Sequence, residues 1–283
     1  MELPATEALL GAPADRTQTL FNYGYRAAWK VSAHGDWFIV KADLRDGFQE
    51  AEVEAQRHAR RAGVPVPEIV ASVAVPVPAL AMRWVDGVPL RSSRSMDAWR
   101  DAGRVLRIAH AASVLRHRLI PWGELVQRWF TEEIPYLVAR RALTAADADA
   151  VLRCVDALRP SLDERTLVWL HGDCQAEHFL VDATTGRVSA VLDWADAQEG
   201  DAAVDFAVLS LFDEDVLPHI LDGYEASAEV RQHLAETLPL YRALRGAGAT
   251  RWLDEHGYTD VDWAIAAVRQ LAQLGHGTLH RTP

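Results

Sequence analysis

The sequence predicts an α+β fold in which a small, strand-rich lobe precedes a larger and mainly helical lobe. Two observations predict this order. Between residues 25 and 90, apolar runs alternate with turn residues, which is typical of strands. From residue 96 onward, long stretches rich in helix-forming residues dominate. The chain has 283 residues, enough for two lobes, and we place the N-terminal lobe at 1–85 and the C-terminal lobe at 86–283.

The elements of the first lobe follow from local signals. Residues 25–43 predict a hairpin, because two apolar runs flank the turn residues "AHGD". Residues 48–63 predict a helix that Gly63 ends. The prolines that follow force extended backbone, and residues 78–90 predict another strand.

The second lobe reads as helices from 96 to 160, two short strands, and helices again after Gly200. The strands are "TLVWL" and "VSAVLDW", and we expect the turn "DATTGR" to join them into a hairpin. Asp173 lies after the first strand and Asp193 at the end of the second. The two carboxylates should therefore emerge near one another.

Composition limits the function classes. The net charge is −11, with 49% hydrophobic and 24% charged residues, and the acidic surplus lies in the last third of the chain. An acidic surplus argues against nucleic-acid binding. The acidic residues would either attract a cationic small molecule or simply form a solvated surface. Cys154 and Cys174 form no CxxC pair, which fits a reducing cytoplasm; Cys174 reads as a small buried residue rather than a nucleophile. We find no signal peptide and no apolar window of about 18 residues, so we expect a soluble cytoplasmic protein.

Asp173 and Asp193 both lie among apolar residues, where a carboxylate is costly unless cations or hydrogen bonds compensate. Such a pair suits phosphoryl transfer. One aspartate accepts the proton of an attacking hydroxyl or orients it, and the other holds the magnesium that bridges nucleotide phosphates.

The spacing around these acids resembles the aminoglycoside phosphotransferase family, whose fold is that of the protein kinases. The matching residues are His171-Gly172-Asp173, His178, Val191-Leu192-Asp193-Trp194, Gly200-Asp201 and Asp205-Phe206-Ala207. The resemblance implies that Asp173 is catalytic and that Asp193 is a metal ligand. We expect structural roles for His171, which orients the loop, for Asp201, a helix N-cap, and for Asp205, which holds the catalytic-loop backbone.

The resemblance covers roughly residues 20–210. It implies that Lys41 contacts nucleotide phosphates and pairs with a helix glutamate, for which we choose Glu54, with Glu50 as the rival. The backbone of Met82, Arg83, Trp84 and Val85 would meet adenine, and Gly24 would belong to the phosphate loop, together with backbone groups of Tyr25 and Arg26.

Two departures from the family pattern concern the nucleotide site. The phosphate loop has one glycine, Gly24, rather than G-x-G-x-x-G, and His178 replaces an asparagine. Imidazole is a poorer magnesium ligand than oxygen. Either His178 still reaches a metal or phosphate, or one of two metals is bound less well.

The expected activity is ATP-dependent O-phosphorylation, with Mg²⁺ and with GTP as a possible donor. The expected substrate is a small cationic antibiotic of the aminoglycoside, macrolide or capreomycin/viomycin type, and the activity would confer resistance. Alternatives are a choline, homoserine or sugar kinase, a nucleotide-binding module without turnover, and a hydrolytic metal site. Oligomeric state stays open. The candidate substrate contacts are Gln175, Glu177, Asp213, Glu214, Asp215, Trp252 and Glu255.

Overall fold

The computed structural model describes residues 1–74 and 77–278 and divides into two compact units. The first unit comprises Met1–Ser113, His171–Gln198 and Pro218–Glu225. The second comprises Val114–Leu170, Glu199–Leu217 and Ala226–Pro283. The first unit therefore contains the N-terminal strands together with both Asp173 and Asp193. The lobe boundary near residue 85 stays a prediction.

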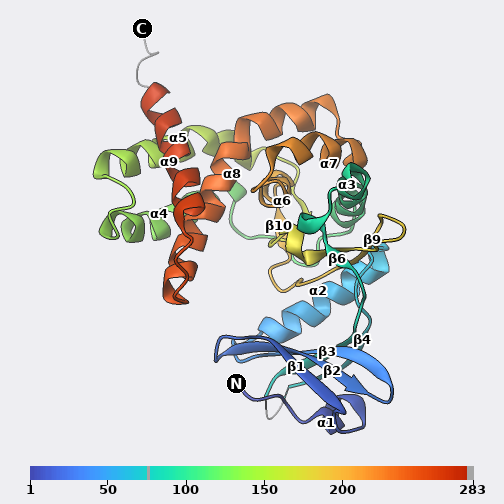
Figure 1. Cartoon of the computed structure of the whole chain (residues 1–283). Helices are drawn as coiled ribbons and strands as arrows, with labels where there is room; N and C mark the ends of the chain where they lie inside the picture. Colours follow the sequence, from blue (N-terminus) through green and yellow to red (C-terminus); the bar gives the residue numbers. More distant parts are fainter. Residues whose placement is uncertain (75–76, 279–283) are drawn as a thin grey trace. The chain divides into compact units, whose positions relative to one another are not determined.

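A five-stranded antiparallel sheet forms the N-terminal part of the first unit, in the order β1-β2-β3-β5-β4 (Figure 1). Its strands are β1 (Arg16–Asn22), β2 (Arg26–Ala33), β3 (Asp36–Asp43), β4 (Ile69–Val73) and β5 (Ala79–Arg83). The predicted hairpin is confirmed: β2 and β3 meet at His34 and Gly35, both with positive φ, as a tight two-residue hairpin turn requires. The sequence did not predict β1.

Helices cover both faces of this sheet (Figure 1). Side chains alternate along each strand, so Trp29 and Val40 point to the face that Leu9 of α1 (Thr6–Leu10) covers. Leu80 and Met82 point to the other face and pack against Val53 of α2 (Phe48–Ala62).

The register of the sheet places two cations on the α2 face. Lys41 lies between Ala28 on β2 and Leu80 on β5, and Arg26 lies opposite Asp43. Both basic side chains therefore point toward the face that α2 covers.

The rest of the first unit supports the two acidic motifs. It contains β6 (Val88–Pro89), the 3-10 turns η1 (Leu90–Ser92) and η2 (Ala176–His178), β8 (Phe179–Val181), β9 (Val188–Val191), α3 (Met96–His110) and α7 (Leu217–Tyr224). Strands β6, β8 and β9 form a sheet in that order. The expectation that "TLVWL" pairs with "VSAVLDW" is wrong, because the turn 182–187 joins β9 to β8 instead.

Helices make up most of the second unit, which confirms the helical expectation. They are α4 (Trp122–Ala139), α5 (Ala145–Asp163), α6 (Ala203–Leu209), the 3-10 turn η3 (Glu214–Val216), α8 (Ala228–Glu255) and α9 (Asp262–Thr278). Strand β7 (Val168–Leu170) pairs with β10 (Gln198–Gly200).

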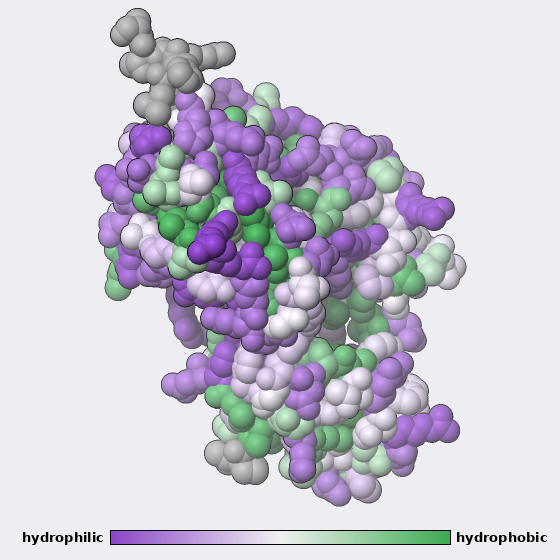
Figure 2. Space-filling view, turned by 60° about the vertical axis from the view of Figure 1, so that its left-hand side comes forward, coloured by the Kyte–Doolittle hydropathy of each residue, from purple (hydrophilic) through white to green (hydrophobic). Residues whose placement is uncertain are grey.

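An apolar pocket of about 510 Å³ lies between α5, α8 and α9, and Leu158, Leu240 and Leu271 contribute to its lining. Figure 2 shows an apolar area of surface close to the C-terminal end of α9. Across residues 1–74 and 77–278, none of the helices combines the length and apolar character needed to cross a membrane.

A buried polar network holds the start of α6 in the second unit. Asp201 Oδ1 accepts from the N–H of Ala203 at 2.9 Å, so Asp201 caps the first turn of the helix, although Ala202 occupies the formal N-cap position. Asp201 Oδ2 accepts from Tyr241 Oη at 2.8 Å and lies 2.6 Å from His233 Nε2. Trp122 Nε1 donates to Tyr241 at 2.8 Å. Burial would raise the pKa of Asp201, but the hydrogen bond and charge of His233 and the other donors lower it.

Candidate active site

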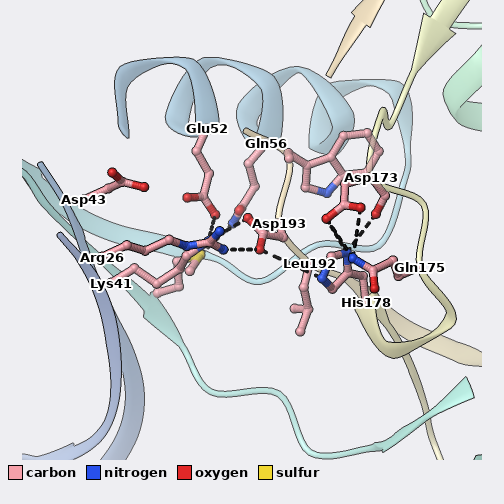
Figure 3. Close-up of polar contacts among 12 residues, drawn as sticks. Arg26, Lys41, Asp43, Glu52, Gln56, Asp173, Gln175, His178, Leu192 and Asp193 are labelled. Atoms are coloured by element: carbon pink, nitrogen blue, oxygen red, sulfur yellow. Dashed lines mark hydrogen bonds and ion pairs between the residues drawn. The ribbon is translucent and has the colours of Figure 1, made fainter. Parts of the chain in front are cut away.

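The two acidic motifs of the first unit meet at one imidazole (Figure 3). His178 Nδ1 lies 3.9 Å from Asp173 Oδ2, and His178 Nε2 lies 3.9 Å from Asp193 Oδ2. All three side chains are less than a fifth exposed. The predicted catalytic carboxylate and the predicted metal carboxylate therefore face the same ring from opposite sides.

His171 fixes the backbone on which these carboxylates stand. Its ring is fully buried, 4.6 Å from that of Trp194 between centroids. His171 Nδ1 accepts from the N–H of Asp173 at 3.3 Å, so its proton is on Nε2, which donates to the carbonyl of Leu192 at 2.8 Å. One neutral imidazole thus links the residue before Asp193 to the backbone of Asp173. This supports the predicted structural role of His171.

Backbone conformation at both motifs departs from regular structure. A Cβ on Gly172 would lie 2.0 Å from the carbonyl oxygen of Asp196, so the position between His171 and Asp173 admits only glycine without a backbone shift. Asp193 has φ of 63°, in the left-handed region that a residue with a side chain seldom adopts. Such strain persists where surrounding contacts enforce it, often at functional sites.

Gln175 holds the carboxylate of Asp173. Its side-chain amide Nε2 donates to Asp173 Oδ1 at 2.9 Å and to Oδ2 at 3.0 Å. The carbonyl of Asp173 accepts from the N–H of Gln175 and from His178 Nδ1, both at 2.8 Å. Gln175, which we predicted to contact substrate, is therefore a positioning residue for Asp173 in this structure.

Lys41 joins Asp193, the predicted metal ligand, to a glutamate of α2. Its Nζ donates to Asp193 Oδ1 at 3.0 Å and forms an ion pair with Glu52. The prediction that Glu54 or Glu50 pairs with this lysine is wrong. The glutamate of the pair is Glu52, whose side chain is 8% exposed.

The periodicity of α2 explains the difference. Glu52 lies one turn from Gln56 on the buried face of the helix, along with Gln49, Val53 and Ala59. Glu50 and Glu54 are exposed and, with Arg57 and Arg61, line a groove beside β4. Acidic and basic residues spaced three or four apart are typical of a solvated stripe, and this signal could have identified the outer face from the sequence.

Arg26 completes a cluster of two cations and two carboxylates. Its Nη2 donates to Asp193 Oδ2 at 2.6 Å. Burial would raise the pKa of Asp193, but the charges of Lys41, His178 and Arg26 outweigh it and hold that pKa far below its usual range. Burial and the Asp193 charge raise the pKa of Glu52 against the opposing effect of Lys41. The sequence analysis assigned only the backbone of Arg26 to the phosphate loop and did not predict the contact of its side chain with Asp193.

The donor set is compatible with magnesium that nucleotide phosphates help to hold. Asp193 offers carboxylate oxygens, which Mg²⁺ prefers, whereas His178 uses Nδ1 in the loop and offers only a nitrogen at Nε2. Within the part of the chain that the structure describes, no three His, Cys, Asp or Glu side chains gather into a metal site. Mg²⁺ in phosphoryl-transfer sites is commonly bound by one or two carboxylates plus substrate phosphates and water. Asp193 fits that pattern, and a metal role for His178 stays a prediction.

Two N–H groups of the predicted adenine-binding segment already have backbone partners. The N–H of Arg83 donates to the carbonyl of Glu68, and that of Trp84 donates to the carbonyl of Trp37, both at 2.9 Å. Met82 is buried, with its sulfur 3.1 Å from Gln56 Nε2. An adenine contact here would depend on other backbone groups, such as those of Val85.

The remaining predicted substrate residues have local partners or lie in the second unit. Glu177 forms an ion pair with Arg91 at 2.9 Å in the first unit. In the second unit, Asp213 caps η3 by accepting from the N–H of Asp215 at 3.1 Å, and Glu214 pairs with Arg242.

The last two candidates are at the end of α8. Trp252 stacks on His256 with ring centroids 4.2 Å apart, and Glu255 is exposed. Asp205 is buried in α6. The substrate roles of these acids and of Trp252, and the role of Asp205, stay predictions.

Comparison with protein families matches residues 22–247 to the phosphotransferase enzyme family. A curated relative, the Bacillus subtilis (strain 168) protein YcbJ, is 32% identical over 78 residues. That match spans a quarter of this chain and a quarter of YcbJ.

Solved structures with this fold include kinases of different substrates. A thermostable mutant of aminoglycoside phosphotransferase APH(4)-Ia, in complex with AMP-PNP and hygromycin B, aligns with a TM-score of 0.74 and 17% identity over 97% of this chain and 100% of that one. A choline/ethanolamine kinase family protein from Mesorhizobium loti aligns with a TM-score of 0.69 and 20% identity over 99% of this chain and 92% of that one. At these identities the likeness establishes the fold, and it confirms the bilobal kinase-like expectation.

Proposed function

Because the chain belongs to the phosphotransferase enzyme family, we propose that it transfers the γ-phosphate of ATP to a hydroxyl group of a small molecule. One observation carries this proposal. Asp173 and Asp193 flank His178, and Asp193 also binds Lys41, which forms a second ion pair with Glu52. A base, a metal carboxylate and a phosphate-binding lysine are the groups that phosphoryl transfer uses.

Each group has a distinct task in the proposed reaction. Asp173, oriented by Gln175, accepts the proton of the acceptor hydroxyl as the oxygen attacks phosphorus. Lys41, held by Glu52, orients the nucleotide phosphates. Asp193 would hold Mg²⁺, which neutralises phosphate charge when bound. Each carboxylate oxygen of Asp173 accepts one hydrogen bond from Gln175 and has the lone pairs to accept another, from the acceptor hydroxyl.

We further propose a cationic acceptor, with an antibiotic as the first class to test and resistance as the biological result. The acidic surplus in the last third of the chain supports attraction of a cation. APH(4)-Ia, which shares the fold, was solved with hygromycin B. A choline/ethanolamine kinase family protein also shares the fold, so a small cationic alcohol is the second candidate. Reduced cysteines and the use of ATP suit action in the cytoplasm.

The test is a panel of acceptors incubated with ATP and Mg²⁺, with ADP release and product masses recorded. The panel contains aminoglycosides, macrolides, capreomycin and viomycin, choline, ethanolamine, homoserine and simple sugars. A compound that gains the mass of one phosphate identifies the reaction and the substrate class. Repeating the accepted reaction with GTP decides the donor preference.

Nucleotide binding is measured in parallel to separate two kinds of negative result. If ATP binds and no acceptor is phosphorylated, the result favours a binding module without turnover. If ATP does not bind at all, the phosphotransferase proposal is wrong.

A further inference from the structure

Two amide groups of the turn between β1 and β2 donate to residues at the ends of these strands. The N–H of Tyr23 donates to the carbonyl of Arg26 at 2.9 Å, and that of Gly24 donates to Asn22 Oδ1 at 3.0 Å. Gly24 has φ of 85°, so glycine suits this turn for conformational reasons alone. The N–H groups of Tyr23 and Gly24 are therefore engaged within the turn, and the phosphate contacts expected of the Tyr25 and Arg26 backbone stay a prediction.

Arg26 stands where that turn enters β2, and its side chain is 24% exposed. The guanidinium lies 5.3 Å from the ring centroid of Phe21 and bonds Asp193 Oδ2 at 2.6 Å. Its cross-strand neighbour is Asp43, but Arg45 binds that carboxylate through Nε at 3.0 Å and Nη2 at 2.6 Å. Arg26 thus binds Asp193 rather than its cross-strand neighbour Asp43.

Both carboxylate oxygens of Asp193 are bound by cations. Lys41 Nζ donates to Oδ1, and Arg26 Nη2 donates to Oδ2. A metal ion that binds Asp193 needs one of these oxygens, and the ion and the guanidinium repel one another. A guanidinium displaced from a carboxylate is well suited to phosphate, because its planar fork can donate two parallel hydrogen bonds.

We propose that Arg26 is a nucleotide-phosphate ligand that exchanges partners. Without nucleotide it neutralises Asp193, and when the metal–nucleotide enters it releases Asp193 and binds the phosphates. Its side chain thereby does what backbone amides do in a glycine-rich loop. The inference rests on the proposed function, since it concerns the nucleotide of that reaction.

The test compares Arg26→Gln with wild type and with Arg100→Gln, which removes a cation from the exposed Arg100–Asp97 ion pair of the same unit. Affinities for ATP with Mg²⁺ and for adenosine are measured by calorimetry, and thermal unfolding verifies that each variant is folded. Arg26→Gln should lose about tenfold or more in ATP affinity and bind adenosine as wild type does, because adenosine lacks phosphates. Arg100→Gln should match wild type with both ligands, and Arg26→Lys should retain part of the ATP affinity.

A second readout separates exchange from a structural role. Mn²⁺ alone, followed by electron paramagnetic resonance, should bind Arg26→Gln about two- to fivefold more tightly than wild type, since the competing cation is gone. Weaker ATP binding combined with tighter Mn²⁺ binding supports the exchange. Unchanged ATP affinity in Arg26→Gln, or weaker Mn²⁺ binding, overturns the inference while the proposed function stands. Failure of wild type to bind ATP overturns the proposed function itself.

Discussion

Glu52 lies in the interior beside Lys41, and its carboxylate determines where the lysine ammonium is held. Glu52→Gln should lower the phosphate-transfer rate by about a hundredfold, because a lysine displaced by an ångström no longer aligns the phosphates. Glu54→Gln is the matched control on the exposed face of the same helix, and its rate should stay within about twofold of wild type. Turnover of both variants with an accepted acceptor measures the difference. Equal losses in the two variants would restore Glu54 as the partner.

His178 donates to the Asp173 carbonyl through Nδ1 and presents Nε2 to Asp193. His178→Asn should fold, since an asparagine amide can also donate to a carbonyl. It should need less Mg²⁺ for half-maximal rate, because an amide oxygen is a better magnesium ligand than an imidazole nitrogen. A magnesium titration of both proteins tests this. An unchanged titration curve would remove His178 from the metal site.

At the scale of elements, Asp101 fastens α3 to the hairpin that carries Asp193. It accepts from Arg104 Nε and Arg187 Nη1 at 2.7 Å and from the N–H of Val188 at 2.8 Å. Burial would raise the pKa of Asp101, but these hydrogen bonds hold it below its usual range. Because the folded pKa is the lower one, the stabilisation is present above about pH 4 and is lost as the pH falls through the folded value.

Asp101→Asn should therefore cost about 1–3 kcal/mol of unfolding free energy at pH 7, since an amide cannot accept all three hydrogen bonds. The difference from wild type should shrink as the pH is lowered from 5 to about 2.5. Asp97→Asn is the control on the same helix, because that carboxylate is 85% exposed. Thermal unfolding across this pH range decides the matter, and a pH-independent difference would contradict the account.

The sequence predicted those elements whose patterns are local. The β2–β3 hairpin, α2 and the helices after residue 96 follow from periodicity and turn residues. It did not predict β1, whose residues are mostly exposed and so lack the alternation of a half-buried strand. The sequence analysis paired β9 with the segment of β7, whereas the structure pairs β9 with β8. The partner of a strand depends on the fold of the whole chain and not on the local sequence.

At the scale of the whole molecule, the order and spacing of the motifs identified more of the candidate site than the local patterns of helices and strands did. The motifs led to Asp173 and Asp193, which the structure places on either side of His178. They did not identify Glu52 or the Arg26 side chain, because those contacts depend on helix phase and sheet register. The acids of the second unit, such as Glu214, have the charge that a cationic acceptor needs, but charge alone does not specify a binding site.

The central claim is that Asp173 activates the acceptor of a phosphoryl transfer, and Asp173→Asn tests it most directly. With an accepted compound, the variant should transfer phosphate at least about 10²-fold more slowly than wild type, the contribution expected of a general base. Its ATP affinity should stay within about twofold, because the proposed site assigns the nucleotide to Lys41 and, through Mg²⁺, to Asp193. Thermal unfolding verifies the fold. Transfer at the wild-type rate by the folded variant would contradict the account.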